Sequence, residues 1–312
     1  MRAVVIADGA VTVDDRPDPV PGAGELLVKV AAAGLNGADL LQVAGFYPPP
    51  PGVPADIPGL ELAGEVAAVG DGVTRFSVGD RVMAIVAGAG QAELALVHER
   101  VAMPVPDGLD WPAAGGFAET FTTAHDALFS QCGLTAGDRL LVNGAAGGVG
   151  VSGVQLGVAA GASVVASVRD TNLHARIADL GAVPVEPASV GEHGPYDVVL
   201  ELVGAVNLAD DLGNLATNGR VAVIGVGAGA RGEIDLRLLM MSRGRIHGST
   251  LRARPLEEKA LAARRVEHGV LPLVRTGRIT VPIEATFPLE EASAAYERMR
   301  TPGKLGKIVL TM

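Results

Sequence analysis

A glycine-rich segment between two apolar runs is the part of the sequence best suited to bind a ligand through its backbone. Residues 143–150 read Asn-Gly-Ala-Ala-Gly-Gly-Val-Gly, between an apolar run at 140–142 and a run at 151–160 that can form a helix. Glycines let the backbone approach a pyrophosphate closely, and the N–H groups at a helix start point at the anion. The residues expected to bind a dinucleotide here are Gly144, Ala145, Ala146, Gly147, Gly148 and Val149.

A second group suited to ligand binding follows the next apolar run, residues 163–168. NAD-specific folds usually end this strand with an acid that binds the ribose 2′-hydroxyl, whereas this chain has Arg169 there. A guanidinium attracts a 2′-phosphate and can bind it in a forked geometry, and the hydroxyl of Ser167 can add a donor. These two residues favour NADPH as the cofactor, although Asp170 can compete for the Arg169 guanidinium.

The elements that must position these residues alternate between strand and helix from about Trp111 onward. Beyond a helical stretch at 118–131, strands are expected at 140–142, 163–168, 183–185, 196–202, 220–224 and 245–251, and helices at 149–160, 171–180, 207–216 and 235–241. Such alternation is typical of a parallel sheet covered by helices. Six strands complete a dinucleotide-binding fold, so residues 116–255 are predicted to form a Rossmann domain with a doubly wound sheet.

Residues 1–115 show a different pattern, with short apolar runs between Gly and Pro breaks. Strands are expected at 4–7, 25–32, 62–69, 81–86, 92–97 and 101–104, and one short helix at 37–43. Closely spaced strands of this kind are typical of a small barrel-like domain. The tail offers helices at 255–269 and 288–296 and a strand at 306–310, too little for a separate domain. We therefore expect residues 256–312 to complete the N-terminal domain of an α/β protein.

The overall composition is that of an acidic globular protein with a large core. The 312 residues carry a formal net charge of −10, which argues against nucleic acid as a partner. The single cysteine, Cys132, excludes a disulfide framework and a cysteine-rich zinc site. Residues 140–168 carry no charge, but glycines and polar residues interrupt the run, so no membrane association is expected. The first residues read as a strand and not as a signal peptide, which predicts a cytoplasmic protein.

Several short segments occur in an order that identifies a family. They are Ala33–Asn36, Gly45–Pro50, Pro58–Gly64, Val78–Val82, Asn143–Gly150, Gly248–Arg252 and Gly306–Leu310. Over nearly the whole chain they resemble the zinc-free quinone oxidoreductases, the ζ-crystallin branch of the medium-chain dehydrogenase/reductase superfamily. The resemblance implies a GroES-like catalytic domain at 1–115, completed by 256–312, with the Rossmann domain between these segments.

The resemblance also bears on metal binding. Zinc-dependent members of the superfamily place a Cys, a His and a second Cys around the catalytic metal. At the matching places this chain has Asn36, Leu60 and Ala118. Leu and Ala cannot bind a metal ion, and a lone Asn binds hard cations only weakly. No metal site is therefore expected.

Further cofactor contacts are implied by the resemblance alone. In this family the positions that match Thr122, Gly225 and Val226 lie near the nicotinamide, and the position of Leu251 faces the cleft or the cofactor. A Lys that relatives carry shortly after the second strand appears here as Leu173. His174 or Arg176 on the following helix can compensate for that missing phosphate contact.

Two residues are expected to act in catalysis, Tyr47 and Asn36. The resemblance places both near the nicotinamide, where either can donate a hydrogen bond to an oxygen that gains negative charge. No nucleophile–base pair stands out in the sequence, which is consistent with hydride transfer by a cofactor. The predicted reaction is NADPH-dependent reduction of a quinone or a conjugated enone, with the proton supplied by Tyr47 or by water.

Two alternative functions are compatible with the same residues. The same hydride chemistry serves an enoyl-thioester reductase, and a non-catalytic, crystallin-like NADPH-binding protein is a further alternative.

The sixth strand, 245–251, is expected at a sheet edge, where exposed backbone groups invite pairing. Relatives commonly pair this edge across a two-fold axis, so the resemblance implies a homodimer.

Overall fold

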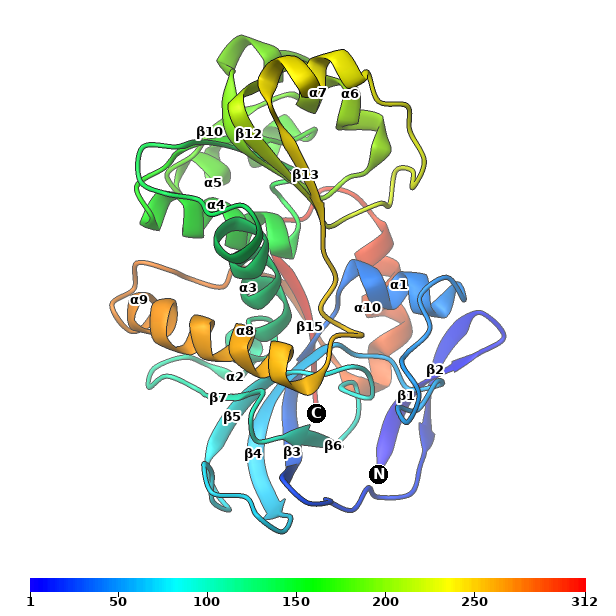
Figure 1. The fold of residues 1–312 in the computed structure, drawn as a ribbon. Coiled ribbons are helices and arrows are strands. Elements are labelled where there is room, and N and C mark those ends of the chain that lie inside the picture. Colours follow the sequence, from blue (N-terminus) through cyan, green and yellow to red (C-terminus); the bar gives the residue numbers. More distant parts are fainter. The chain divides into compact units, whose positions relative to one another are not determined.

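The computed structural model describes all 312 residues, which divide into two compact units (Figure 1). Unit 1 comprises Met1–Thr122, Leu251–Pro302 and Lys307–Met312, and unit 2 comprises Thr123–Thr250 and Gly303–Gly306. The sequence placed the boundaries at 115/116 and 255/256. The structure divides the chain at 122/123 and at 250/251 instead. The first division falls within α3 (Ala118–His125), and α2 (Trp111–Gly115) packs on strands β3 (Glu25–Gly34) and β4 (Glu61–Val69) of unit 1.

Unit 1 is built on a seven-stranded sheet with a separate two-stranded hairpin. The sheet order is β14-β15-β3-β4-β5-β7, and β6 also pairs with β3. The bounds are β3 Glu25–Gly34, β4 Glu61–Val69, β5 Arg81–Ile85, β6 Leu94–His98, β7 Ala102–Pro104, β14 Ile283–Pro288 and β15 Lys307–Thr311. β15 runs antiparallel to β3, with Leu310 opposite Ala33, so the C-terminal segment is part of the N-terminal sheet.

Two strands of unit 1 were missing from the sequence prediction, β14 and β2. β2 (Ala10–Asp15) pairs with β1 (Arg2–Ala7) through a two-residue turn, Asp8-Gly9. Both turn residues have positive φ, 49° and 75°. Asp-Gly between alternating apolar residues is a strong hairpin signal, because both positions of such a turn need left-handed backbone. The signal was therefore present in the sequence.

The helices of unit 1 are short except for α8. Their bounds are α1 Gly37–Val43, α2 Trp111–Gly115, α8 Leu256–Gly269, α9 Leu271–Arg275 and α10 Ala292–Arg300. α1, which carries candidate residues at its start, has the range that the sequence predicts. Its N-cap is Asn36, whose backbone N–H donates a hydrogen bond to the Asp39 side chain at 2.8 Å. This is the reciprocal half of a capping box.

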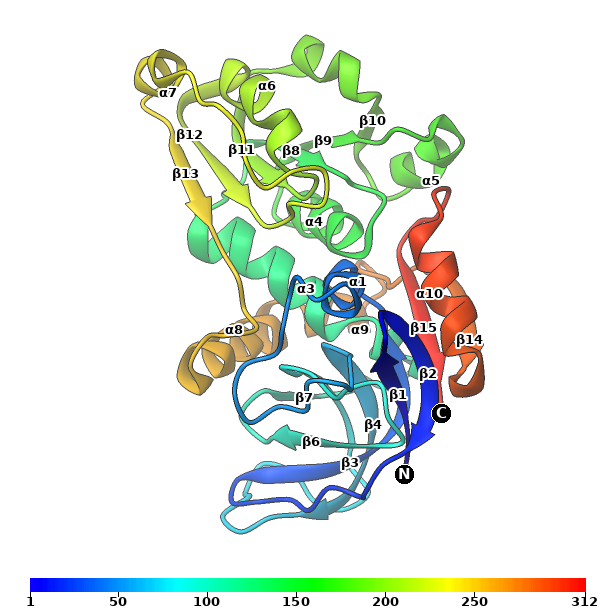
Figure 2. The same cartoon turned by 90° about the vertical axis from the view of Figure 1, so that its right-hand side faces the viewer.

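Unit 2 contains one parallel sheet of six strands. Their order is β10-β9-β8-β11-β12-β13, as Figure 2 shows. The bounds are β8 Arg139–Asn143, β9 Ser163–Ser167, β10 Val183–Val185, β11 Tyr196–Glu201, β12 Leu215–Val223 and β13 Arg245–Gly248. In chain order this is 3-2-1-4-5-6, the order of a complete dinucleotide-binding fold, which confirms the predicted fold class. The strand order reverses between β8 and β11, and ligands of such sheets bind at that point.

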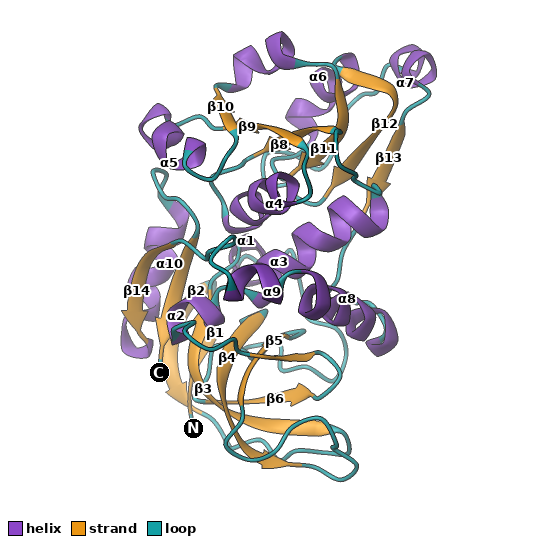
Figure 3. Cartoon of the chain, turned by 90° about the vertical axis from the view of Figure 1, so that its left-hand side faces the viewer, coloured by secondary structure: helices purple, strands orange, loops and turns teal.

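Helices cover this sheet, as Figure 3 shows. Their bounds are α4 Gly148–Ala159, α5 His174–Ala178, α6 Leu208–Gly213 and α7 Leu236–Ser242, and α3 continues as a π-helical segment, Asp126–Gln131. α4 packs closely because it presents glycines: a Cβ on Gly153 would lie 2.5 Å from Leu200, and one on Gly157 would lie 2.6 Å from Leu140. None of the helices in either unit has the length and apolar character required to cross a bilayer.

Candidate active site

The glycine turn joins β8 to α4 at the point where the strand order reverses. Gly144 has φ +76°, a left-handed conformation that reverses the chain at little steric cost. The Ala145 N–H donates to the Ser167 carbonyl at 3.3 Å, which ties the turn to the end of β9. The Ala146 carbonyl accepts from the Gly306 N–H at 2.9 Å. The turn is therefore held by neighbouring backbone on both sides.

The exposed part of the turn is the start of α4. Gly147 is the N-cap residue, and its solvent exposure contrasts with the full burial of Ala145. The first N–H groups of a helix have no acceptor within the helix, and the helix dipole favours negative charge there. Gly150 cannot be replaced without movement, because its Cβ would lie 2.4 Å from the Gly144 carbonyl. These features fit a pyrophosphate.

Arg169 lies just beyond β9 and carries an exposed guanidinium. No hydrogen bond or ion pair engages its side chain, and the competing carboxylate of Asp170 instead accepts from the Asn172 backbone and side-chain N–H groups at 3.1 and 3.0 Å. Ser167, the last residue of β9, is buried. The His174 ring lies 3.1 Å from the Val168 carbonyl, so one of its nitrogens is already engaged. The cation that remains available at this strand end is Arg169.

The loop after β12 contains the other predicted contacts of unit 2. The Gly225 N–H donates to the Glu201 carbonyl at 3.1 Å, and a Cβ on Gly225 would lie 2.1 Å from the Leu202 carbonyl. Only glycine fits this approach. The Val226 side chain is half-exposed. Gly225 and Val226 thus lie beside the carboxyl end of β11, on the same sheet edge as the glycine turn.

Beneath this edge lies a buried polar cluster that the sequence analysis missed. The Glu201 carboxylate accepts from the backbone N–H groups of Val203 and Gly204 at 2.5 and 2.7 Å. The Asn143 side-chain amide donates to Glu201 and to Asp211, both at 2.7 Å. Asn143 immediately precedes the glycine turn, so the cluster links that turn to the segment after β11. The available signal was a polar residue, Asn143 or Glu201, directly after the apolar run in each of two strands, 139–143 and 196–201.

Asp211 is held protonated by its surroundings. Burial raises the pKa of Asp211 to about 8, and the neighbouring Glu201 charge adds to the shift. From about pH 4 to about pH 8 the folded chain retains a proton that the unfolded chain has lost. The free energy of unfolding therefore falls as pH rises through this range, by up to ~1.4 kcal/mol per pH unit. The variant Asp211→Asn, which is neutral at every pH, is expected to lose this slope.

Urea unfolding of both proteins, followed by circular dichroism from pH 5 to pH 8, tests this expectation. The stability of Asp211→Asn relative to the wild type should improve steadily with pH. Asp179→Asn is a matched control, because Asp179 belongs to the same unit and its side chain is exposed. Parallel pH profiles of the wild type and Asp211→Asn would show that Asp211 is ionised in the folded chain.

In unit 1, Tyr47 is held by a buried arginine. The Arg252 guanidinium donates to the Tyr47 carbonyl at 2.7 Å and lies 4.9 Å from the centroid of the Tyr47 ring. It also donates to the Ala87 carbonyl at 2.7 Å and to the Gln42 side-chain oxygen at 2.6 Å. Arg252 is only 6% exposed. The backbone of Tyr47 is thus fixed, together with the end of α1.

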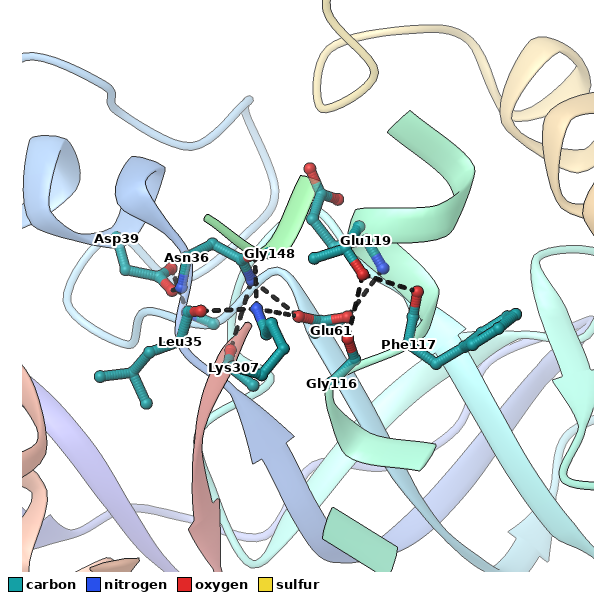
Figure 4. Close-up of polar contacts among 12 residues, drawn as sticks. Leu35, Asn36, Asp39, Glu61, Gly116, Phe117, Glu119, Gly148 and Lys307 are labelled. Carbon is teal, nitrogen blue, oxygen red and sulfur yellow. Dashed lines mark hydrogen bonds and ion pairs between the residues drawn. The ribbon is translucent and has the colours of Figure 1, made fainter. Parts of the chain in front are cut away.

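Asn36 belongs to a second buried network in unit 1 (Figure 4). The Lys307 ammonium lies 2.6 Å from the Glu61 carboxylate and 2.8 Å from the Asn36 side-chain oxygen. The Asn36 amide nitrogen donates to Glu61 at 3.0 Å and to the Gly34 carbonyl at 3.3 Å. Both hydrogens of this amide therefore have acceptors inside the unit. Lys307 was not recognised from the sequence, where it appeared only as part of the closing Gly306–Leu310 motif.

The remaining predicted residues of unit 1 are Thr122 and Leu251. The Thr122 hydroxyl is buried and has no hydrogen-bond partner. Buried hydroxyls nearly always have a partner, so this one is suited to a ligand that supplies it. Leu251 is buried, and its carbonyl accepts from the Arg254 N–H at 3.1 Å.

The structure contains no group of three His, Cys, Asp or Glu side chains that could hold a metal ion. Of the three residues at the zinc-ligand positions, Leu60 and Ala118 are apolar and buried. The third, Asn36, contacts the Lys307 ammonium. The cation beside the buried Glu61 carboxylate is thus a lysine of the chain itself.

Comparison with known proteins gives consistent matches along the chain. Residues 22–132 match the family described as "Alcohol dehydrogenase GroES-like domain", and residues 161–310 match "Zinc-binding dehydrogenase". The chain is 32% identical to the quinone oxidoreductase of Rattus norvegicus over 309 residues, which is 94% of this chain and 91% of the relative. It is 30% identical to the acryloyl-coenzyme A reductase of Metallosphaera sedula, with 100% of both chains covered.

Solved structures agree with these matches. A mycobacterial protein complexed with NADPH superposes with a TM-score of 0.87 at 28% identity, and a protein described as an NAD-dependent alcohol dehydrogenase gives 0.87 at 27% identity. Both comparisons cover 100% of each chain. The fold and the glycine turn define a pyridine-nucleotide-binding member of the medium-chain dehydrogenase/reductase superfamily. Within it, the chain belongs to the quinone oxidoreductase branch.

Proposed function

We propose that this protein is a cytoplasmic, zinc-free oxidoreductase that uses NADPH to reduce a quinone or a conjugated enone. The observation that carries the choice of cofactor is the unpaired Arg169 guanidinium at the end of β9, where an NAD-specific fold would have an acid. The likeness to quinone oxidoreductases over 94% of the chain supports the choice of reaction.

The residues present fit NADPH. The glycine turn and the start of α4 suit the pyrophosphate, and Arg169 suits the 2′-phosphate. The Thr122 hydroxyl is a buried polar group without a partner, which a bound nucleotide can satisfy. When bound, the nicotinamide supplies the hydride.

The proposed task of the protein residues is to stabilise charge on the acceptor. A quinone or enone oxygen gains negative charge as it is reduced, and a positioned donor lowers the energy of that state. We assign this role to the Tyr47 hydroxyl. Water can deliver the proton to the reduced acceptor afterwards. We assign Asn36 a positioning role, because both hydrogens of its amide already have acceptors.

The proposal predicts that the purified protein oxidises NADPH when 1,4-naphthoquinone or 9,10-phenanthrenequinone is added. Tyr47→Phe should lower kcat about 10²-fold, since removing one donor of this kind commonly has that effect, with binding of NADPH unchanged. The loss of the NADPH absorbance band measures the rate. No oxidation with any quinone or enone of a broad panel, despite tight NADPH binding, would favour the non-catalytic alternative. A stoichiometric zinc content would contradict the zinc-free assignment.

A second candidate activity is enoyl-thioester reduction. The observation that favours it is the 30% identity to an acryloyl-coenzyme A reductase over the full length of both chains. The chemistry is the same hydride transfer, with the acceptor oxygen on a thioester. Comparison of kcat/KM for crotonyl-coenzyme A with that for 1,4-naphthoquinone separates the two, and a higher value for the thioester would replace the quinone assignment.

We further propose that the chain forms a homodimer through unit 2. β13 is the edge strand of its sheet, so one side of its backbone is free to pair. Nearby α7 exposes three large apolar side chains, Leu236, Met240 and Met241, by 65–78%. Such a group of exposed apolar residues is typical of a protein interface. Light scattering on the purified chain measures its mass, and a monomer at micromolar concentration would contradict this proposal.

A further inference from the structure

Unit 1 contains a cavity that the proposed function does not use. Its volume is about 450 Å³, within the range of about 300–1,000 Å³ typical of small-molecule sites. It is bounded by β6, the loop around Val53, the segment after β5 and the first turn of α8. We call it the β6 cavity. All of its lining residues belong to unit 1.

The walls of the β6 cavity are mainly aliphatic. All five residues of β6 line the cavity; Ala95 and Val97 are buried, whereas Leu94, Leu96 and His98 are only half-buried. Half-buried aliphatic side chains from other elements join them, namely Val53, Val86 and Leu256. These side chains keep part of their apolar surface in contact with solvent, and an apolar ligand would remove it from water.

One charged group in the β6 cavity has no partner. Lys259 lies one helical turn after Leu256 on α8, so both side chains share one face of the helix. Its amine makes no hydrogen bond and no ion pair, and burial lowers the pKa of Lys259 because the charged form loses water. A half-buried ammonium without a counter-ion is unfavourable, and an anion would relieve this cost.

The other charged groups that line the cavity already have partners. Arg16 pairs with Asp56 at 3.1 Å, and the Met1 ammonium pairs with Asp18 at 2.7 Å. The Glu25 carboxylate accepts from a backbone N–H at 2.9 Å. The unmatched group is therefore the single positive charge of Lys259.

We propose that the β6 cavity is a binding site for a small amphipathic carboxylate, whose apolar chain packs on Leu96 and its neighbours and whose carboxylate pairs with Lys259. An apolar pocket with one well-placed polar group is the usual form of a small-molecule site. The pairing is a charge-assisted hydrogen bond in partly dry surroundings, where such bonds are stronger than in water. None of the residues that line this site belongs to the glycine turn or to the residues assigned to hydride transfer.

Calorimetric titration of the full chain with octanoate and with 1-octanol tests the proposal. We expect saturable, one-site binding of octanoate to the wild type. Lys259→Met should lower the affinity for octanoate at least about tenfold, equivalent to ~1.4 kcal/mol, and leave the affinity for 1-octanol unchanged. Leu96→Trp, which fills the cavity, should lower the affinity for both ligands. Lys29→Met, a change at an exposed lysine on β3, is the matched control and should alter neither.

The outcome can also contradict the proposal. Octanoate binding that Lys259→Met leaves unaltered would show that the amine takes no part, and no saturable binding by the wild type would show that the cavity is not a site. The titration is repeated with saturating NADPH. Unchanged octanoate affinity supports a separate site, whereas competition would place the carboxylate at the nucleotide site and overturn the assignment. Thermal unfolding of each variant confirms that it is folded.

Discussion

Replacement of Lys307 by methionine is expected to lower the free energy of unfolding of unit 1 by about 3–5 kcal/mol, as is usual when one partner of a buried ion pair is removed. The Lys307 side chain is 3% exposed and that of its partner Glu61 is not exposed at all. Without the ammonium, the Glu61 carboxylate would be a buried charge with no opposite charge beside it. The Leu35 carbonyl, which accepts from Lys307 at 2.6 Å, and the Asn36 side-chain oxygen would each lose a donor.

The measurement can be restricted to unit 1. The chain has one tryptophan, Trp111, and it lies in α2 of this unit, stacked with the Arg81 guanidinium at 4.2 Å. Urea unfolding followed by tryptophan fluorescence therefore reports on unit 1. Lys29→Met, at an exposed position on β3, removes the same charge and should change the stability by less than about 0.5 kcal/mol.

A double variant separates loss of the charge pair from loss of packing. Glu61→Gln combined with Lys307→Met removes both charges but retains a side-chain oxygen that can accept from the Glu119 N–H, at 2.8 Å in the native chain. The double variant should be clearly more stable than Lys307→Met alone. If the double variant is less stable still, the lysine acts through packing and not through its charge. A loss below about 1 kcal/mol in Lys307→Met would show that the pair is solvated.

The parts of this molecule that follow local rules could be predicted from the sequence. The glycine turn, α1 and the six parallel strands each have a signal within a few residues, either a change of hydrophobic period or a glycine where backbone must come close. Gly225 belongs to this group, since its position after the fifth strand follows from the strand count. The order of short motifs along the chain identified the family for the same reason.

The residues that were missed act over long separations. Lys307 and Glu61 are 246 positions apart in the numbering, and nothing near either residue indicates the other. Asn143 and Asp211 are likewise joined only by the fold. A lysine after a glycine at a strand start reads as an exposed charge, because lysines are almost never fully buried unless paired. Only the pairing of β15 with β3 brings it to the buried carboxylate.

The contacts of Asn36 with Lys307 and Glu61 change the role that the sequence suggested for Asn36. As a family position near the nicotinamide, it was expected to act in catalysis beside Tyr47. In the structure its amide connects Lys307 to Glu61. Its replacement would thus disturb the buried charges before it affected any acceptor. Arg252 holds the backbone of Tyr47, so replacement of the Tyr47 side chain is the more direct kinetic test of catalysis.

Replacement of Arg169 by alanine is expected to lower kcat/KM for NADPH about 10–100-fold and to leave kcat/KM for NADH within about twofold. A hydrogen bond to a charged group contributes ~1.5–3 kcal/mol, and each ~1.4 kcal/mol corresponds to a factor of ten. The change should lie in KM, because the 2′-phosphate is remote from the reacting carbon and binds equally in the ground and transition states. Steady-state kinetics with a common quinone and both cofactors measure this.

The size of the effect follows from what Arg169 does in the unliganded chain. Its guanidinium makes no ion pair, and Asp170 is already engaged by Asn172, so removal of the arginine breaks no native contact and should not alter stability. A selective loss of NADPH activity can then be ascribed to the phosphate. Arg169→Asp should go further and favour NADH, because the carboxylate repels the phosphate and accepts from a ribose hydroxyl. If Arg169→Ala keeps the preference for NADPH and Arg176→Ala loses it, the 2′-phosphate is bound by Arg176 on the next helix and not by Arg169.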